Sequence, residues 1–153
     1  MMARAAEAAA EEAGKQKMAK PLLLAVTVLT SLKGDGLQEI GMPPDPAGQV
    51  MRLARLARKA GIDGVVCSPQ EIGIIKKEFG SDLLVVTPGI RPSWSALQDQ
   101  KRIMTPGEAF ENGADYIVVG RPITGAASPQ EAFLRIVEEL KRPIDSAHGK
   151  DRA

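Results

Sequence analysis

The chain has 153 residues, of which 44% are apolar, so it has room for one domain of ordinary size with a buried core. Its 20 basic and 19 acidic side chains leave a formal charge of +1, which provides no overall field for a nucleic-acid backbone or an anionic membrane surface. Composition therefore excludes disorder over most of the chain, and it predicts that any bound anion is held by a local site.

The scarce residue types restrict the chemistry further. The single cysteine, Cys67, excludes a disulfide framework and a thiolate metal cluster, and we expect it to be a small core side chain. The only histidine, His148, lies near the C-terminus, where a solvated side chain supports neither a metal site nor a serine–histidine triad. The longest apolar run, residues 21–32, is too short to span a bilayer, and no export signal is recognisable. We therefore expect a cytoplasmic protein without membrane contacts.

The first half of the chain predicts a helix, a strand and another helix. Alanines at helical spacing predict a helix over residues 3–18. The apolar run that follows lacks two-residue alternation, which predicts a parallel strand over 22–29 that is covered on both faces. Glycine and proline residues leave only a short helical piece at 37–40. An amphipathic pattern from Ala47 onward predicts a helix that stops at Gly61.

After Gly61 the same pair of signals occurs three times, namely a short apolar strand and then a capping box with proline at the first helical position. The capping residues are Ser68, Thr105 and Ser128. Gly80 and Gly113 mark intervening helix ends. The three predicted strands are 64–67, 83–87 and 116–119.

This order, a helix followed by four rounds of strand and helix, predicts an α/β protein with parallel strands and right-handed crossovers. Two architectures fit it. One is a small open four-stranded sheet with helices on both faces, and the other is four of the eight units of a TIM (β/α)₈ barrel. In either architecture, the carboxyl ends of the strands gather polar and glycine residues at one rim, where such folds carry their chemistry.

A candidate anion site follows the last predicted strand. Gly120 and Arg121 come directly after it, and Gly125 lies four residues beyond Arg121. A glycine lets backbone N–H groups approach an anion closely, and an arginine can bind two phosphate oxygens at once. The barrel rule places phosphate sites at these last two units. The alternative is a tight turn with an arginine in solvent.

A long connection lies between Gly89 and Pro106, much longer than the usual strand-to-helix loop. It contains the only tryptophan, Trp94, together with several cationic and amide side chains. We favour a lid that closes over a bound anion, since such a lid excludes water and adds hydrogen-bond donors. The alternative is a surface excursion pinned by Trp94.

Five segments occur in order along the chain: PLLLAVTVLTSL, GVVCSPQEI, LLVVTPGIRP, DQKRIMTP and ADYIVVGRPIT. In their sequence and spacing they resemble the orotidine 5′-phosphate decarboxylase family over about residues 1–140. The resemblance implies a (β/α)₈ barrel that converts orotidine 5′-phosphate (OMP) to UMP and CO₂ in pyrimidine biosynthesis. It also implies a homodimer with each active site near the subunit interface, and a lyase that uses no metal or organic cofactor.

The resemblance also implies roles for five residues. Thr30 matches a residue that touches the pyrimidine, Arg91 a substrate-binding arginine, and Gln100 the lid glutamine that reaches the phosphate. Gly120 and Arg121 match the phosphate-binding pair after the final strand, in agreement with the anion site inferred above.

The chain departs from the family pattern at the reaction centre. The family holds its catalytic lysine between carboxylates in an Asp-x-Lys-x-x-Asp motif after an earlier strand, and the sequence contains no such motif. We therefore interpret residues 1–142 as the C-terminal part of a single barrel domain, beginning inside the fourth unit, with a flexible tail at 143–153. No catalytic residue is assigned. We expect the chain to hold the phosphate of OMP or UMP without catalysing the reaction.

Half a barrel would leave two sheet edges and one apolar face uncovered. We expect such a chain to be poorly soluble, or to pair with another copy or with the missing half. Two alternative functions stay open at this point: a different phosphate-binding barrel enzyme that acts on a sugar phosphate, and a non-catalytic half-barrel that only binds phosphate ligands.

Overall fold

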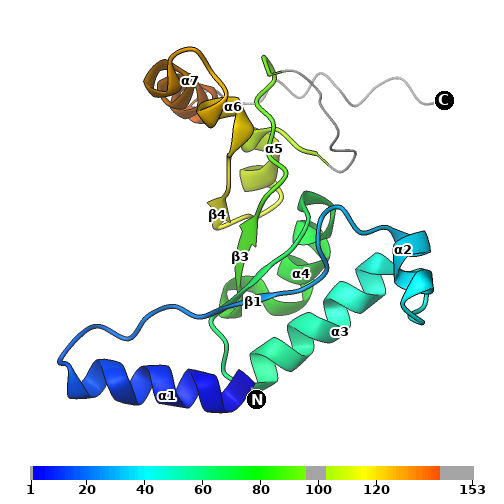
Figure 1. The fold of residues 1–153 in the computed structure, drawn as a ribbon, viewed down its shortest axis with the longest axis vertical. Helices are drawn as coiled ribbons and strands as arrows, with labels where there is room; N and C mark the ends of the chain where they lie inside the picture. Colours follow the sequence, from blue (N-terminus) through cyan, green and yellow to red (C-terminus); the bar gives the residue numbers. More distant parts are fainter. Residues whose placement is uncertain (1, 96–102, 142–153) are drawn as a thin grey trace.

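The protein forms a four-stranded parallel sheet in which the strands follow the order of the chain. The computed structural model describes residues 2–95 and 103–141. The strands pair in the order β1-β2-β3-β4, so β1 and β4 are the two edges (Figure 1). This arrangement confirms the predicted parallel βα units. The strands are β1 (Leu24–Val26), β2 (Gly64–Val66), β3 (Leu84–Thr87) and β4 (Tyr116–Ile117).

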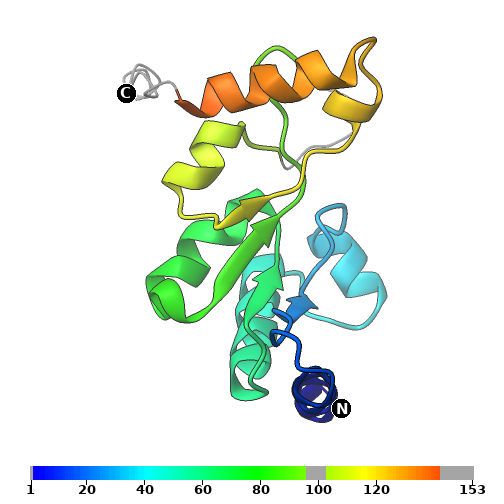
Figure 2. The ribbon, with the colours of Figure 1, turned by 90° about the vertical axis from the view of Figure 1, so that its left-hand side faces the viewer.

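Helices connect successive strands and cover one side of the sheet. Helices α3, α4 and α5 contact β2, β3 and β4 respectively, and they lie along the same side of the sheet (Figure 2). Helices α1 and α7 lie at opposite ends of the molecule (Figure 1). None of the described helices is long and apolar enough to cross a membrane. The helices are α1 (Met2–Lys15), α2 (Gly34–Glu39), α3 (Pro46–Lys59), α4 (Ile72–Phe79), α5 (Pro106–Glu111), α6 (Arg121–Thr124) and α7 (Pro129–Lys141), with short 3₁₀ turns η1 (Pro69–Glu71) and η2 (Gly80–Asp82).

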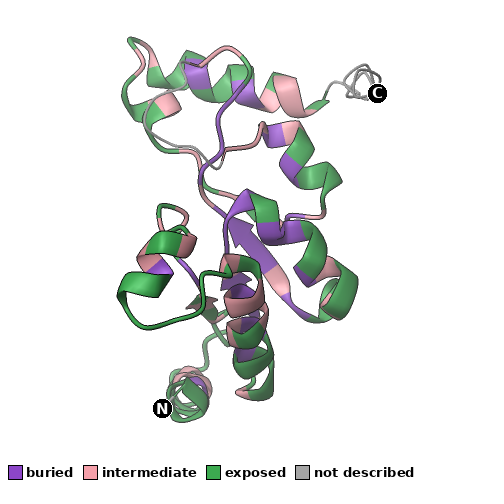
Figure 3. Ribbon diagram, turned by 90° about the vertical axis from the view of Figure 1, so that its right-hand side faces the viewer, coloured by how far each residue is buried: buried purple, intermediate pink, exposed green. Residues whose placement is uncertain are grey.

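The core lies between the sheet and helices α3 and α4. Val65 of β2 and Val85 of β3 are paired in register and fully buried, as are Val50 of α3 and Ile72 and Ile75 of α4. Figure 3 shows the buried residues concentrated on the two central strands and the helix faces beside them. Cys67, at the end of β2, is buried in the same cluster, as predicted.

The opposite face of the sheet is less covered, and here one prediction is wrong. The strand expected over 22–29, covered on both faces, is limited to β1, and Leu24 and Val26 are 44% and 62% exposed. Side chains alternate between the two faces of a strand, and only one face of β1 packs on described helices. Tyr116 of β4, which shares a register row with Val26, is also exposed. The apolar side chains of this face are therefore exposed on the two edge strands, whereas Val86 of β3, in the same row, is buried.

Local signals explain most of the helix boundaries. Thr105 and Glu108 form a complete capping box, in which each side chain accepts from the backbone N–H of the other residue. At Ser68 the prediction needs correction, because the hydroxyl accepts from Gln70 N and opens the 3₁₀ turn η1 before α4 begins. The predicted stops Gly61, Gly80 and Gly113 all have positive φ, which confirms them as helix ends.

Gly64 of β2 gives a direct test of the packing between strands. A Cβ at this position would lie 2.7 Å from both Cβ and O of Leu84, the residue paired with it on β3. We expect Gly64→Ala to destabilise the fold by about 1–3 kcal/mol, as measured by urea unfolding, because the strands must move apart. The matched control is Gly14→Ala in α1, where an added Cβ meets nothing within 4 Å, and we expect it to be neutral or stabilising. Equal stability of the two variants would contradict this packing.

Asp63, just before β2, gives the fold a pH dependence. Its carboxylate accepts a hydrogen bond from Leu23 N at 2.8 Å and lies 3.4 Å from Lys20 Nζ. The backbone hydrogen bond, helped by Lys20, holds the pKa of Asp63 below its ordinary value of 3.8 although partial burial opposes this. The carboxylate therefore stabilises the folded state fully above that value, and this contribution is lost as the pH falls through the lowered pKa.

We expect Asp63→Asn to lower the melting temperature at pH 6 and to flatten its dependence on pH below about 4. The matched control is Glu11→Gln on the exposed surface of α1. If the melting temperatures of wild type and Asp63→Asn changed with pH in the same way, this contact would contribute nothing to the stability of the fold.

Candidate functional site

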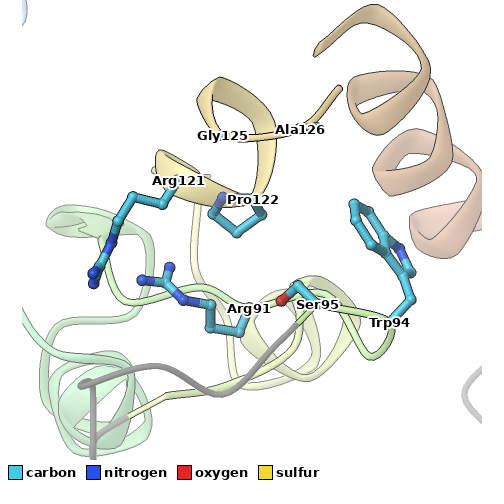
Figure 4. Close-up of a pocket in the computed structure, with 7 residues that line it drawn as sticks. All are labelled: Arg91, Trp94, Ser95, Arg121, Pro122, Gly125 and Ala126. Carbon is cyan, nitrogen blue, oxygen red and sulfur yellow. The ribbon is translucent and has the colours of Figure 1, made fainter. Parts of the chain in front are cut away.

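A pocket of about 250 Å³ lies beyond the carboxyl ends of β3 and β4 (Figure 4). One wall comes from the segment after β3 and the other from α6 and the turn that follows it. Figure 4 shows the side chains of Arg91 and Arg121 extending in the same direction, on the side of the pocket away from Trp94. The lining residues are Arg91, Trp94, Ser95, Arg121, Pro122, Gly125 and Ala126.

Arg91 is held in place by the backbone around it. The residue is only 6% exposed, its Nη1 donates to Ile90 O at 2.8 Å, and its backbone N donates to Met104 O at 2.9 Å. Gly89, two residues earlier, has φ of +80°, which an L side chain adopts only with strain. The sequence Pro-Gly-Ile-Arg thus turns sharply out of β3 and presents a fixed guanidinium to the pocket.

Arg121 begins the single helical turn α6. The backbone N–H groups of Ile123 and Thr124 donate to Gly120 O, and that of Gly125 donates to Arg121 O at 2.9 Å. A Cβ on Gly125 would lie 3.0 Å from Arg121 O, so this turn is tight. Arg121 itself is exposed, in contrast to Arg91. The pocket is therefore lined by one fixed guanidinium group, that of Arg91, and one solvent-accessible guanidinium group, that of Arg121.

The electrostatics of the pocket favour an anion. Arg91 and Arg121 both line it, and none of the lining residues is acidic. Arginine forks match the oxygens of a phosphate or carboxylate, so two guanidinium groups on one small cavity favour a bound anion. A chain with a formal charge of only +1 thus places two arginines at one pocket at the rim of its sheet.

The structure brings some of the predicted site residues together and leaves others apart. Arg91 and Arg121 line the same pocket, and Gly120 adjoins it as the residue before α6. An added Cβ on Gly120 would meet nothing within 4 Å, so the described residues give no steric reason for glycine there. Thr30 lies in the turn after β1, at the other edge of the sheet, and does not line this pocket. Gln100 lies outside the described residues, as do His148 and the predicted tail at 143–153.

The ends of the long connection lie side by side. Ile90 and Met104 form a parallel bridge, so the chain leaves β3 and returns to the same place before α5. Trp94, which would be a surface pin in the alternative to the lid, lines the pocket, and Ser95 beside it was not singled out from the sequence. Their position next to Arg91 in the sequence is the only signal that could have indicated this. Residues 96–102 are not described, so the lid stays a prediction.

One half-buried lysine outside the pocket lies beside a carboxylate. Lys76 Nζ lies 2.6 Å from Asp115 Oδ2 and 3.1 Å from Leu83 O. The same carboxylate accepts from Val85 N at the beginning of β3. This pair therefore lies at the amino ends of the strands, opposite the pocket, where barrel residues serve stability. Among the described residues, no three His, Cys, Asp or Glu side chains lie close enough together to hold a metal ion.

Comparison with known proteins identifies the family. The family model described as "Orotidine 5′-phosphate decarboxylase / HUMPS family" matches residues 1–136. The chain belongs to this family. It is 51% identical over 140 residues to the orotidine 5′-phosphate decarboxylase of Geotalea daltonii and 54% identical over 140 residues to that of Gluconobacter oxydans. Each alignment covers 92% of this chain.

Solved structures of the orotidine 5′-phosphate decarboxylase family show the same architecture. The crystal structure of the Lactobacillus acidophilus enzyme matches with a TM-score of 0.67 at 43% identity, over 82% of this chain and 51% of that one. The chain spans 58% of the Geotalea relative and 59% of the Gluconobacter relative. The four βα units thus match about half of the family's barrel, which confirms the prediction of a partial barrel.

Proposed function

We propose that this chain is the part of an orotidine 5′-phosphate decarboxylase that binds the phosphate monoester of OMP and UMP. The observation that carries the proposal is that Arg91 and Arg121, 30 positions apart in the sequence, line one pocket at the carboxyl rim of the sheet. Membership of the decarboxylase family supports the choice of ligand.

The two arginines would bind the phosphate in different ways. Arg91 is buried and already fixed, so it loses little conformational entropy when the ligand binds. Arg121 is exposed and would close onto the opposite side of the phosphate. Gln100 would add a donor from the lid, Gly120 its backbone N–H, and Thr30 a contact to the pyrimidine ring.

The carbon–carbon lyase step needs groups that this chain does not supply. When the bond between C6 of the pyrimidine and the carboxylate breaks, CO₂ leaves and the electron pair remains on C6, which must then receive a proton. A cation beside C6 stabilises that charge and delivers the proton. In the family this is the lysine of the Asp-x-Lys-x-x-Asp motif, which the sequence lacks. We therefore propose that activity, in a cytoplasmic homodimer, requires a polypeptide carrying that motif.

Titration of UMP into the purified chain, with binding measured by calorimetry, tests the phosphate site. We expect Arg121→Ala to weaken UMP binding by about tenfold or more, because each charge-assisted hydrogen bond contributes about 1.5–3 kcal/mol. The matched control is Arg52→Ala, which removes an exposed arginine from α3, far from the pocket, and should bind like wild type. Equal affinities of wild type and Arg121→Ala would refute the assignment.

A non-catalytic phosphate-binding module, or an enzyme for another sugar phosphate, is the second candidate function. The supporting observation is that Thr30, the expected base contact, does not line the arginine pocket. Ribose 5-phosphate should then bind as tightly as UMP. Tighter binding of UMP than of ribose 5-phosphate would favour the decarboxylase assignment.

A further inference from the structure

Two contacts connect α7 to the segment that carries the pocket wall after β3. Ser93 donates from its backbone N to Glu139 Oε1 at 3.3 Å and from its hydroxyl to Glu139 Oε2 at 3.4 Å. The guanidinium carbon of Arg135 lies 4.5 Å from the centre of the Trp94 ring. Arg135 and Glu139 are four residues apart and therefore lie on the same face of α7. That face binds two consecutive residues, Ser93 and Trp94.

Trp94 separates two cavities. It lines the arginine pocket on one side and, on the other, a cavity of about 390 Å³ that Arg135 and Glu139 also line. Figure 4 shows its ring between the arginine pocket and α7. The indole Nε1 is buried and has no hydrogen-bond partner among the described residues. The ring is thus held by packing and by the cation–π contact with Arg135.

The position of Trp94 affects Arg91, because the two residues belong to one short segment that is held at one end by Met104 and at the other by α7. Arg91 is attached at its backbone to Met104, and Ser93 and Trp94 are attached to α7. Helix α7 also packs against α6, which carries Arg121. One helix therefore supports both walls of the arginine pocket, although neither Arg135 nor Glu139 lines that pocket.

We propose that Arg135 and Glu139 are positioning residues: by holding Trp94 and Ser93 they keep the wall next to Arg91 in the geometry that binds phosphate. This inference rests on the proposed phosphate site. When the contacts that support a binding site are removed, the site loses affinity for its ligand. Part of the binding free energy is then used to order the residues of the pocket wall.

The test uses the full chain and four variants: Arg135→Ala, Arg135→Lys, Glu139→Gln and, as the matched control, Lys141→Ala on the same helix. The first measurement needs no ligand. Trp94 is the only tryptophan, so its emission and its quenching by acrylamide report on this segment alone. We expect Arg135→Ala to shift the emission to longer wavelength and to increase quenching, Arg135→Lys to restore both largely, and Lys141→Ala to match wild type.

The second measurement is UMP affinity by calorimetry. We expect a loss of about three- to tenfold in Arg135→Ala, a smaller loss in Glu139→Gln, and none in Lys141→Ala. Unchanged Trp94 emission and quenching in Arg135→Ala would overturn the inference, as would a changed emission with an unchanged UMP affinity. Failure of the wild-type chain itself to bind UMP would contradict the proposed function, whereas the emission would still show whether α7 holds Trp94.

Discussion

Replacing Arg91 with alanine should weaken UMP binding by about a hundredfold, more than any other single change in the pocket. Arg91 is buried and fixed by Ile90 O, so its guanidinium would meet a bound phosphate with little competition from bulk water. Removal of one partner of a desolvated charge pair costs about 2–5 kcal/mol, and a hundredfold loss of affinity corresponds to about 2.7 kcal/mol. Calorimetric titration of UMP measures the effect directly.

Arg91→Lys is the companion variant, because it keeps the charge and loses the planar fork. We expect it to fold like wild type by circular dichroism and to bind UMP about tenfold more weakly. An Arg91→Lys variant with wild-type affinity would mean that the site recognises charge alone. A folded Arg91→Ala variant with wild-type affinity would remove Arg91 from the site.

The second large effect concerns catalysis. We expect the purified chain to leave OMP absorbance unchanged, and we expect decarboxylation to appear when a polypeptide with the first βα units of the family and the Asp-x-Lys-x-x-Asp motif is added. The added units would cover the exposed face of β1 and β4 and place the catalytic lysine above the pyrimidine, so that mass action links assembly to activity.

The control for this experiment is the same added polypeptide with the motif lysine replaced by alanine, which should assemble with the chain and show no turnover. Robust decarboxylation by the chain alone would contradict the account. It would require a lysine of this chain to act at C6, and the one described lysine that lies half-buried beside a carboxylate, Lys76, is at the opposite end of the strands.

Much of the fold is predictable because its signals are local. The capping box at Thr105 and the glycines at 61, 80 and 113 set helix boundaries through the backbone of a few residues. The exposure of Val26 is not predictable in this way. An apolar run looks the same whether or not the rest of a barrel covers it, so burial of that strand depends on partners far away in the sequence. The single turn α6 is likewise too short for periodicity to reveal.

The candidate site was only partly predictable. Parallel strands present their functional residues at one rim of the sheet. Together with the family resemblance, this rule predicted that Arg91 and Arg121 lie at the same rim. The sequence favoured a lid over a surface excursion pinned by Trp94, but nothing in the local sequence shows that Arg135, 41 positions later, packs against the Trp94 ring. Long-range side-chain contacts of this kind follow from the packing of α7, which periodicity alone does not place.

A crystal structure of the chain with UMP would show directly where the phosphate binds. We expect the phosphate oxygens to lie within hydrogen-bond distance of the guanidinium groups of both Arg91 and Arg121, in the pocket bordered by Trp94 and Gly125. A phosphate bound elsewhere on the chain, with neither arginine in contact with it, would contradict the account.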